Sequence, residues 1–177
     1  MVIQLKEVVR DADMLQFAQS AIAKFACKDK DVEGFLKGKA FDFERRDKSR
    51  TYLVFDDCGK NLVGYYSLSL KALPFGTTVS KNTIKNIDGF SKDVDAAGII
   101  LIGQFGKDCD IAHSISGSIL LNTCMETIYA AQNLVGGRFV MLECHDIDKV
   151  VSFYTANGFQ RLQYDPRDKY LQMIRRL

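Results

Sequence analysis

The segment from Leu101 to Leu121, LIGQFGKDCDIAHSISGSILL, carries the residue types best suited to binding a phosphorylated ligand. An apolar run typical of a buried strand leads into a short polar loop and then into a helical pattern. A helix N-terminus presents unpaired N–H groups and a partial positive charge, which favour phosphate or pyrophosphate. Gly103 and Gly106 lie in or beside the strand, where glycine often marks a bulge that lets a ligand approach the backbone. The segment is not a P-loop, because no GK[ST] follows, and it is not a GxGxxG loop.

The cysteines and histidines do not form a recognisable metal or disulfide pattern. There are five cysteines, an odd number, and no two are spaced as CxxC. Cys144, His145 and Asp146 are the one local cluster with ligand chemistry, but adjacent residues of a strand point to opposite faces. Two histidines also leave little room for a histidine-based triad. We therefore expect no metal site, and we expect most cysteines to be small buried apolar residues.

Composition excludes several classes of protein. The 177 residues include 24 Lys+Arg and 22 Asp+Glu, a formal net charge of +2, and 47% are hydrophobic. These values are those of a globular domain and exclude disorder of the whole chain. No apolar run approaches the roughly 20 residues that span a bilayer, and the charged first ten residues lack a signal-peptide core, so we expect no membrane partner and a cytoplasmic location. The balanced charge argues against a nucleic-acid binder that depends on bulk charge, but a local basic patch stays open.

The N-terminal half must supply the elements that support this segment. We predict, in order, an opening strand within 3–9, helices over 11–28 and 32–46, a hairpin of strands 51–55 and 62–70, and a loop with a short helix over 71–97.

The C-terminal half reads as a central βαβ unit with closing strands. A strand over 98–102 precedes a helix that starts near Ser116, with Ser114 and Ser116 as N-cap candidates, and ends at Gly136-Gly137. A strand over 139–143 precedes a helix capped by Asp146 and stopped by Gly158, and strands over 159–164 and 169–174 follow. The order predicts an α/β or α+β sheet with helices packed on its faces.

Residues 142–159, LECHDIDKVVSFYTANGF, supply a second motif. Together with the strand–loop–helix segment they resemble the GNAT superfamily of N-acetyltransferases, in which a strand precedes a Q/R-G-x-G-x-G/A loop and a later helix carries A-x-x-F-Y-x-x-x-G-F. Residues 102–108 fall on the strand motif, 112–117 on the loop and 150–159 on the later helix. The resemblance covers about residues 50–165. It implies an acyl-CoA N-acyltransferase fold over 1–177, a single domain with a mixed central sheet, a bulged strand near Gly106 and helices on both faces.

The resemblance also implies a mechanism, in which an amine substrate attacks acetyl-CoA directly. Tyr154 falls where the family often places a tyrosine hydroxyl near the thioester sulfur, so it is expected to protonate the leaving thiolate as general acid. The strand backbone from Phe105 to Lys107 is expected to pair with the pantetheine arm, and residues 112–117 to hold the pyrophosphate. Residues 1–97 would then shape the acceptor side and 98–177 would hold acetyl-CoA. The implied cofactor-binding residues are Phe105, Gly106, Lys107, Ala112, His113, Ser114, Ile115, Ser116, Gly117, Ser118 and Asn157.

The loop departs from the family pattern. Only its last glycine is kept, as Gly117, while Ala112 replaces Gln or Arg and His113 and Ile115 replace glycines. Main-chain N–H groups can still contact pyrophosphate whatever the side chain. Two hypotheses therefore stand, an N-acetyltransferase and a non-catalytic acyl-CoA-binding regulatory module with a degenerate loop. Apart from these hypotheses, the simpler structural interpretation of Tyr154 is a core aromatic on the apolar face of a helix, and that of 112–117 is an ordinary capped loop.

The acceptor is left open. The N-terminal helices resemble those of toxin-like acetyltransferases that modify aminoacyl-tRNA, while a small amine or a protein amine is equally compatible. A basic patch for tRNA would have to come from residues 45–50 or from the lysines of 81–92, although surface charge is the simpler interpretation. Glu143 and Gln104 are the candidates for a general base acting through water. A homodimer is compatible with the sequence.

Overall fold

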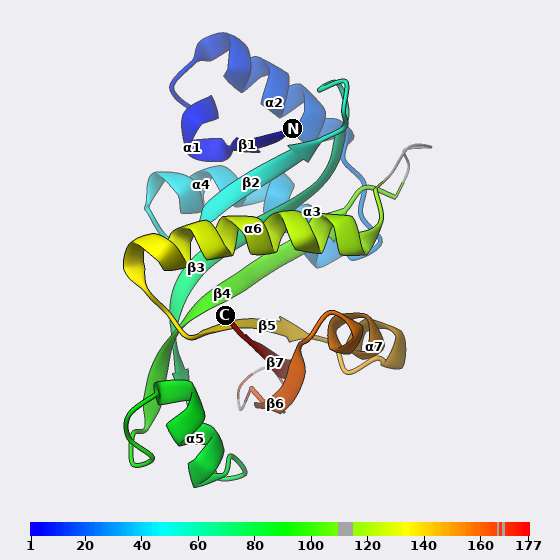
Figure 1. The fold of residues 1–177 in the computed structure, drawn as a ribbon. Helices are drawn as coiled ribbons and strands as arrows, with labels where there is room; N and C mark the ends of the chain where they lie inside the picture. Colours follow the sequence, from blue (N-terminus) through cyan, green and yellow to red (C-terminus); the bar gives the residue numbers. More distant parts are fainter. Residues whose placement is uncertain (110–114, 166, 168) are drawn as a thin grey trace. The chain divides into compact units, whose positions relative to one another are not determined.

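The computed structural model describes residues 1–109, 115–165, 167 and 169–177 (Figure 1). The chain divides into two compact units. Unit 1 consists of Met1–Ser69 and Gly103–Met125, and unit 2 consists of Leu70–Ile102 and Glu126–Leu177. Strands β3 (Leu62–Pro74) and β4 (Ala96–Lys107) and helix α6 (Gly117–Val135) contribute residues to both units.

The strands form one seven-stranded mixed sheet in the order β1-β2-β3-β4-β5-β7-β6. The remaining strands are β1 (Val2–Gln4), β2 (Arg50–Phe55), β5 (Phe139–Cys144), β6 (Gln160–Tyr164) and β7 (Leu171–Arg176). β4 and β5 are parallel, pairing Ile100 with Val140, while β1 with β2, β2 with β3, β5 with β7 and β6 with β7 are antiparallel. The predicted α/β sheet is therefore confirmed, with β4 longer at both ends than the predicted strand over 98–102.

Four helices of unit 1 precede β2: α1 (Leu5–Val8), α2 (Ala12–Lys24), α3 (Lys30–Gly38) and α4 (Ala40–Arg45) (Figure 1). The Asp11 carboxylate accepts the N–H groups of Asp13 and Met14, and Asp29 caps α3 in the same way. The strand predicted within 3–9 is wrong beyond Gln4. Leu5 and Val8 are 0% and 1% exposed, and residues three apart share one face of a helix, so these positions fold as a helical turn.

The helix predicted over 32–46 is likewise two helices, α3 and α4, separated at Lys39, whose φ of −123° is not helical. Apolar side chains of these helices pack with residues of β2 and β3, among them Leu36, Leu53 and Tyr65. The core of unit 1 therefore lies between this helical layer and the strands.

A buried carboxylate links α4 to β2 within this core. Glu44 is only 4% exposed, yet both of its oxygens are bonded. Oε2 accepts the Thr51 N–H at 2.9 Å, and Oε1 accepts from Nη1 of Arg50 at 3.1 Å. These bonds offset the cost of removing the charge from water.

We expect Glu44→Gln to lower the free energy of unfolding by about 1–2 kcal/mol, because a neutral amide replaces the charged acceptor of Thr51 and Arg50. Urea denaturation measures the change. Asp42→Asn is the matched control, since Asp42 is an exposed carboxylate of the same helix that pairs with Arg45. Its replacement is expected to cost about 0.5 kcal/mol or less. Equal losses for the two variants would show that burial of Glu44 is unimportant.

Unit 2 contains α5 (Lys81–Asp88), the second half of α6, and α7 (Asp148–Ala156). Ser80 caps α5 by accepting the Thr83 N–H at 3.1 Å, and Gly89 ends it with a φ of +90°. Apolar side chains from these strands and α5 form its core, including Leu73, Ile87 and Met141. Within the described residues, no helix combines the length and the apolar character needed to cross a membrane.

The prediction that Asp146 caps a helix is wrong. Helix α7 begins at Asp148, and its N-cap, Ile147, makes no side-chain cap. The Asp146 carboxylate instead accepts two hydrogen bonds from Arg161, at 2.5 and 3.1 Å, and one from the Tyr164 hydroxyl. The hydrogen bond from Arg161 is the main cause of the lowered pKa of Asp146. The predicted stop is confirmed, since Gly158 follows α7 with a φ of +84°.

Candidate functional site

A hydrogen bond links the end of β4 to the segment just before α6. Phe105 is half-buried, Gly106 is buried and Lys107 is exposed. The Lys107 Nζ donates to the backbone carbonyl of Ile115 at 3.2 Å. Ala112, His113 and Ser114 lie outside the described residues, so the part of the predicted phosphate loop that can be placed is Ile115, Ser116 and Gly117.

Helix α6 begins as the sequence predicts. The Ser116 Oγ accepts the Ile119 N–H at 3.2 Å, which makes Ser116 its N-cap, and Gly117 is the first helical residue. Ser116 and Ser118 are exposed. A helix of 19 residues has a developed dipole, so the start of α6 has the donors and the partial charge suited to a pyrophosphate.

Gly106 makes room for a helix of the chain itself. A Cβ at this position would lie 2.6 Å from Cγ1 of Val32 in α3 and 3.3 Å from the Tyr65 ring. The Tyr65 hydroxyl also donates to the Val32 carbonyl, which holds α3 against this part of the sheet. The close approach that the glycine permits is therefore the packing of α3 on β4.

Tyr154 lies on α7 in unit 2 and is half-buried. Its ring packs edge-on against Phe153 and Phe159, with centroids 5.1 and 5.7 Å apart. Its backbone carbonyl accepts the N–H groups of Asn157 and Phe159, both at 3.0 Å. The tyrosine is thus held at the end of a rigid helix and keeps part of its surface accessible.

Asn157 is the C-cap of α7. Its Nδ2 donates to the Phe153 carbonyl at 2.7 Å, and its own carbonyl accepts from Nη1 of Arg175 at 3.0 Å. These bonds satisfy carbonyl groups at the end of the helix and give Asn157 a structural role in addition to the predicted contact with the cofactor.

A polar network at the end of β5 includes residues that sequence reasoning missed. Glu143 accepts from the Lys71 Nζ at 2.6 Å and from the Gln172 Nε2 at 2.8 Å. Gln172 is fully buried and accepts in turn from Gln163 at 2.8 Å. The sequence singled out Glu143 alone; the signal for Gln172 was a polar residue inside the apolar strand LQMI.

Gln104, the other candidate for a general base, lies on β4 in unit 1. Its Oε1 is buried, and no hydrogen-bond partner for it is found in the part of the chain that the structure describes. Neither candidate is distinguished as a base by this geometry, since Glu143 is engaged in an ion pair and Gln104 carries a neutral amide.

Three of the five cysteines, Cys27, Cys124 and Cys144, are buried, as expected for most of them. Burial is the main cause of the raised pKa of each of the three thiols. Cys144 packs against the Met173 sulfur at 3.9 Å, and the exposed His145 ring lies on Tyr170 with centroids 4.8 Å apart. Both are strand-end residues with partners of their own. Among the described residues, no group of three His, Cys, Asp or Glu side chains is placed to hold a metal ion.

We expect N-ethylmaleimide at pH 8 to label the exposed Cys58 and Cys109 in the folded protein and to spare the three buried thiols until the chain is unfolded. Peptide mass spectrometry measures the extent at each site. Rapid labelling of Cys144 in the folded protein would contradict this account.

Several of the basic residues that are candidates for a nucleic-acid patch contact other side chains. Arg45 pairs with Asp42, Arg50 pairs with Glu44 and Asp47, and the Lys48 Nζ lies 5.5 Å from the Phe43 ring centroid. In unit 2, Lys81 pairs with Asp93 at 3.1 Å. These contacts favour the interpretation as surface charge.

Comparisons with known proteins extend the description. No protein-family model matches the chain. The chain is 25% identical over 158 residues to the probable toxin TacT of Sinorhizobium fredii, covering 84% of this chain and 83% of the relative. It also matches a structure of KacT in which one tyrosine is mutated to phenylalanine, with a TM-score of 0.66, 25% identity and coverage of 85% of both chains.

A third match is AtaT in complex with acetyl-methionyl-tRNAfMet, with a TM-score of 0.70, 19% identity and coverage of 97% of this chain and 92% of AtaT. AtaT has also been solved with acetyl-CoA and the C-terminus of the antitoxin AtaR. AtaT and KacT are toxins with the GNAT acetyltransferase fold. The chain is therefore a GNAT-fold protein that is similar, over most of its length, to toxin acetyltransferases.

Proposed function

We propose that this protein is an acetyl-CoA-dependent N-acetyltransferase whose acceptor is the α-amine of an aminoacyl-tRNA. The choice of acceptor rests on the AtaT complex, because acetyl-methionyl-tRNAfMet is the product of acetyl transfer to a charged tRNA. The similarity to AtaT extends over 97% of this chain. Two observations support a site for the pyrophosphate of acetyl-CoA. Ser116 caps the N-terminus of α6, and the Lys107 side chain donates a hydrogen bond to the Ile115 carbonyl just before this helix.

The chemistry requires few groups from the protein. The nitrogen of the neutral amine attacks the thioester carbonyl carbon, the C–S bond breaks, and the leaving thiolate takes the proton of the Tyr154 hydroxyl. The amine loses a proton to solvent, and the Tyr154 phenolate takes a proton back from solvent. Main-chain N–H groups near Phe105 would stabilise the oxyanion that forms on the carbonyl. The backbone of β4 would orient the pantetheine arm.

The proposal accounts for a site without an obvious strong base. The α-amino group has a pKa of about 7.7–8.0, so a substantial fraction is already neutral near pH 8. A lysine amine, with a pKa of about 10.4, would need a base to remove its proton. An α-amine acceptor therefore fits the residues present better than a lysine side chain does.

The proposal is tested by CoA release with the purified protein, acetyl-CoA and a pool of charged tRNA. Deacylated tRNA is the matched control, because it offers the same RNA without the amine. Release with charged tRNA alone supports the proposal. If the protein binds acetyl-CoA but releases no CoA with charged tRNA, polyamines or peptides, the non-catalytic module is favoured. The glycine-poor loop is the sequence feature that suggests this alternative.

A further inference from the structure

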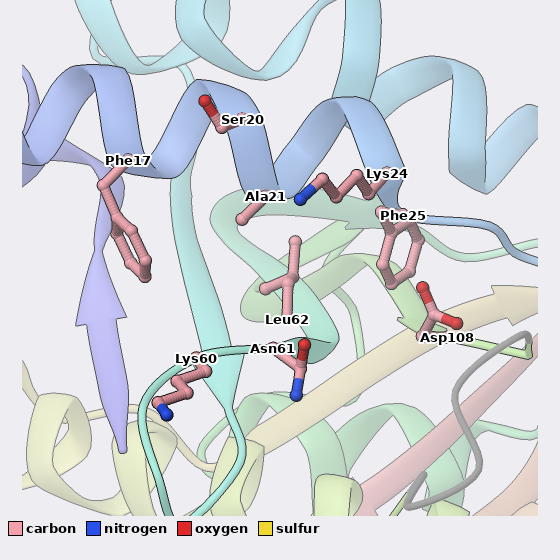
Figure 2. A pocket seen from close by; sticks show the side chains of 9 residues that line it. All are labelled: Phe17, Ser20, Ala21, Lys24, Phe25, Lys60, Asn61, Leu62 and Asp108. Atoms are coloured by element: carbon pink, nitrogen blue, oxygen red, sulfur yellow. The ribbon is translucent and has the colours of Figure 1, made fainter.

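Two cysteines of unit 1 that are far apart in the sequence, Cys27 and Cys109, lie where the ends of α2 and β4 meet. The Cys109 N–H donates to the carbonyl of Ala26, the residue before Cys27, at 2.9 Å. The Ala26 N–H in turn donates to Oδ2 of Asp108 at 3.0 Å. Figure 2 shows the side chains of Phe25 and Asp108 close together at this junction. Two hydrogen bonds therefore hold the two chain segments side by side.

This pairing brings the two cysteines within reach of a disulfide. The Ala26 carbonyl belongs to the peptide bond that leads into Cys27, so peptide and hydrogen-bond geometry keep the Cα atoms of Cys27 and Cys109 within about 7 Å of each other. Disulfide-bonded cysteines have Cα atoms separated by no more than about 7 Å. The pKa of the Cys27 thiol is raised mainly by burial, and the negative charges that raise it further include that of Cys109, an effect that requires the two sulfur atoms to be near each other.

The two thiols differ in their access to solvent. Cys109 is exposed, whereas Cys27 is only 7% exposed, and both are reduced in this structure. The Cys27 Sγ lies in the core of unit 1, 3.4 Å from where a Cβ of Gly106 would be. An oxidant in solution therefore reaches Cys109 first, and Cys27 is the thiol that waits beside it. Redox-sensing cysteines have this arrangement, with an accessible thiol next to a second one that completes the disulfide.

We propose that Cys27 and Cys109 form a reversible disulfide when the protein meets a peroxide. The Cys109 sulfur attacks one oxygen of hydrogen peroxide, the O–O bond breaks, and a sulfenic acid and one water form. The Cys27 sulfur then attacks the Cys109 sulfur, the S–O bond breaks, and the departing hydroxide takes the Cys27 proton to form a second water. The two thiols thus lose two electrons to the peroxide. A dithiol such as dithiothreitol reverses the step by exchange.

The disulfide would join the end of β4 to the connection between α2 and α3. A covalent bond that closes a long loop restricts the unfolded chain more than the folded one. We therefore expect the oxidised protein to unfold at a urea concentration about 1 M higher than the reduced protein. Neither the bond nor its effect on unfolding involves acetyl transfer, so this proposal succeeds or fails separately from the proposed function.

The test is treatment of the reduced full chain with equimolar hydrogen peroxide, followed by blocking of the remaining thiols, proteolysis and tandem mass spectrometry. We expect linked peptides in which the bridge joins Cys27 to Cys109, and dithiothreitol should remove both the bridge and the rise in the urea midpoint. Cys58→Ser is the matched control, because Cys58 is another exposed cysteine of unit 1 and its replacement should leave the bridge intact. Cys109→Ser, also at an exposed position, should abolish the bridge and the rise.

Cys27→Ala provides a second measurement. Without the Cys27 thiol, the sulfenic acid of Cys109 should progress to the sulfinic acid, which dithiothreitol does not reverse. A wild-type protein in which peroxide converts Cys109 to the sulfinic acid while Cys27 stays a thiol would overturn the proposal. A bridge that joins Cys109 to any cysteine other than Cys27, in the same molecule or in a second one, would overturn it as well.

Discussion

Replacing Tyr154 with phenylalanine is expected to lower the rate of acetyl transfer by about a hundredfold or more and to leave the affinity for acetyl-CoA unchanged. A positioned general acid contributes roughly 10²–10⁴-fold, and the substitution removes only the hydroxyl that would protonate the thiolate. The ring contacts with Phe153 and Phe159 are retained, so the fold should not change. Single-turnover transfer and calorimetry with acetyl-CoA measure the two effects separately.

Tyr129→Phe provides the matched control. Tyr129 is an exposed tyrosine of α6 in the same unit, and its hydroxyl accepts from Nη2 of Arg175 at 3.1 Å. Removing this hydroxyl should leave the transfer rate within about twofold of the wild type, since an exposed hydrogen bond contributes little. If both variants keep the wild-type rate, Tyr154 is a packing residue and the leaving thiolate is protonated in another way.

The second large effect concerns the packing of α3 on β4. Gly106→Ala is expected to lower the free energy of unfolding by about 1–3 kcal/mol, because its methyl group would sit 2.6 Å from Cγ1 of Val32. The added Val32→Ala substitution removes the obstructing methyl groups. The double variant should therefore lose at least about 1 kcal/mol less stability than the two single losses combined. Urea denaturation of all four proteins of this cycle provides the values.

Gly34→Ala is the control for this cycle. Gly34 lies inside α3, and a Cβ there would meet nothing within 4 Å. The substitution should stabilise the protein by about 0.5–1 kcal/mol, as expected for alanine in place of glycine within a helix. A neutral Gly106→Ala, or additive losses for Gly106 and Val32, would refute the packing explanation.

Local patterns predicted the elements of the site well. The apolar stripe from Leu120 onward marked α6, the hydroxyl of Ser116 marked its start, and Gly158 marked the end of α7. Each of these signals depends on residues within a few positions of one another. The sequence alone was therefore sufficient to locate them.

The errors arose where the local structure depends on residues that are far apart in the sequence. Asp146 looked like a helix cap, but it pairs with Arg161, 15 residues away, which no local pattern reveals. The apolar run predicted a strand over 98–102 with Gly103 and Gly106 in or beside it, whereas β4 continues to Lys107, and Gly106 is needed for the approach of α3. The network of Lys71, Glu143 and Gln172 joins three strands and could not be assembled before their register was known.

The most direct test of acetyl transfer is mass spectrometry of the aminoacyl group after incubation of the protein with isotope-labelled acetyl-CoA and charged tRNA. The account predicts a labelled acetyl group on the α-amine of the amino acid, formed by the wild-type protein and strongly reduced by Tyr154→Phe. Acetyl-CoA that binds while every amino acid released from the tRNA remains unlabelled would contradict it.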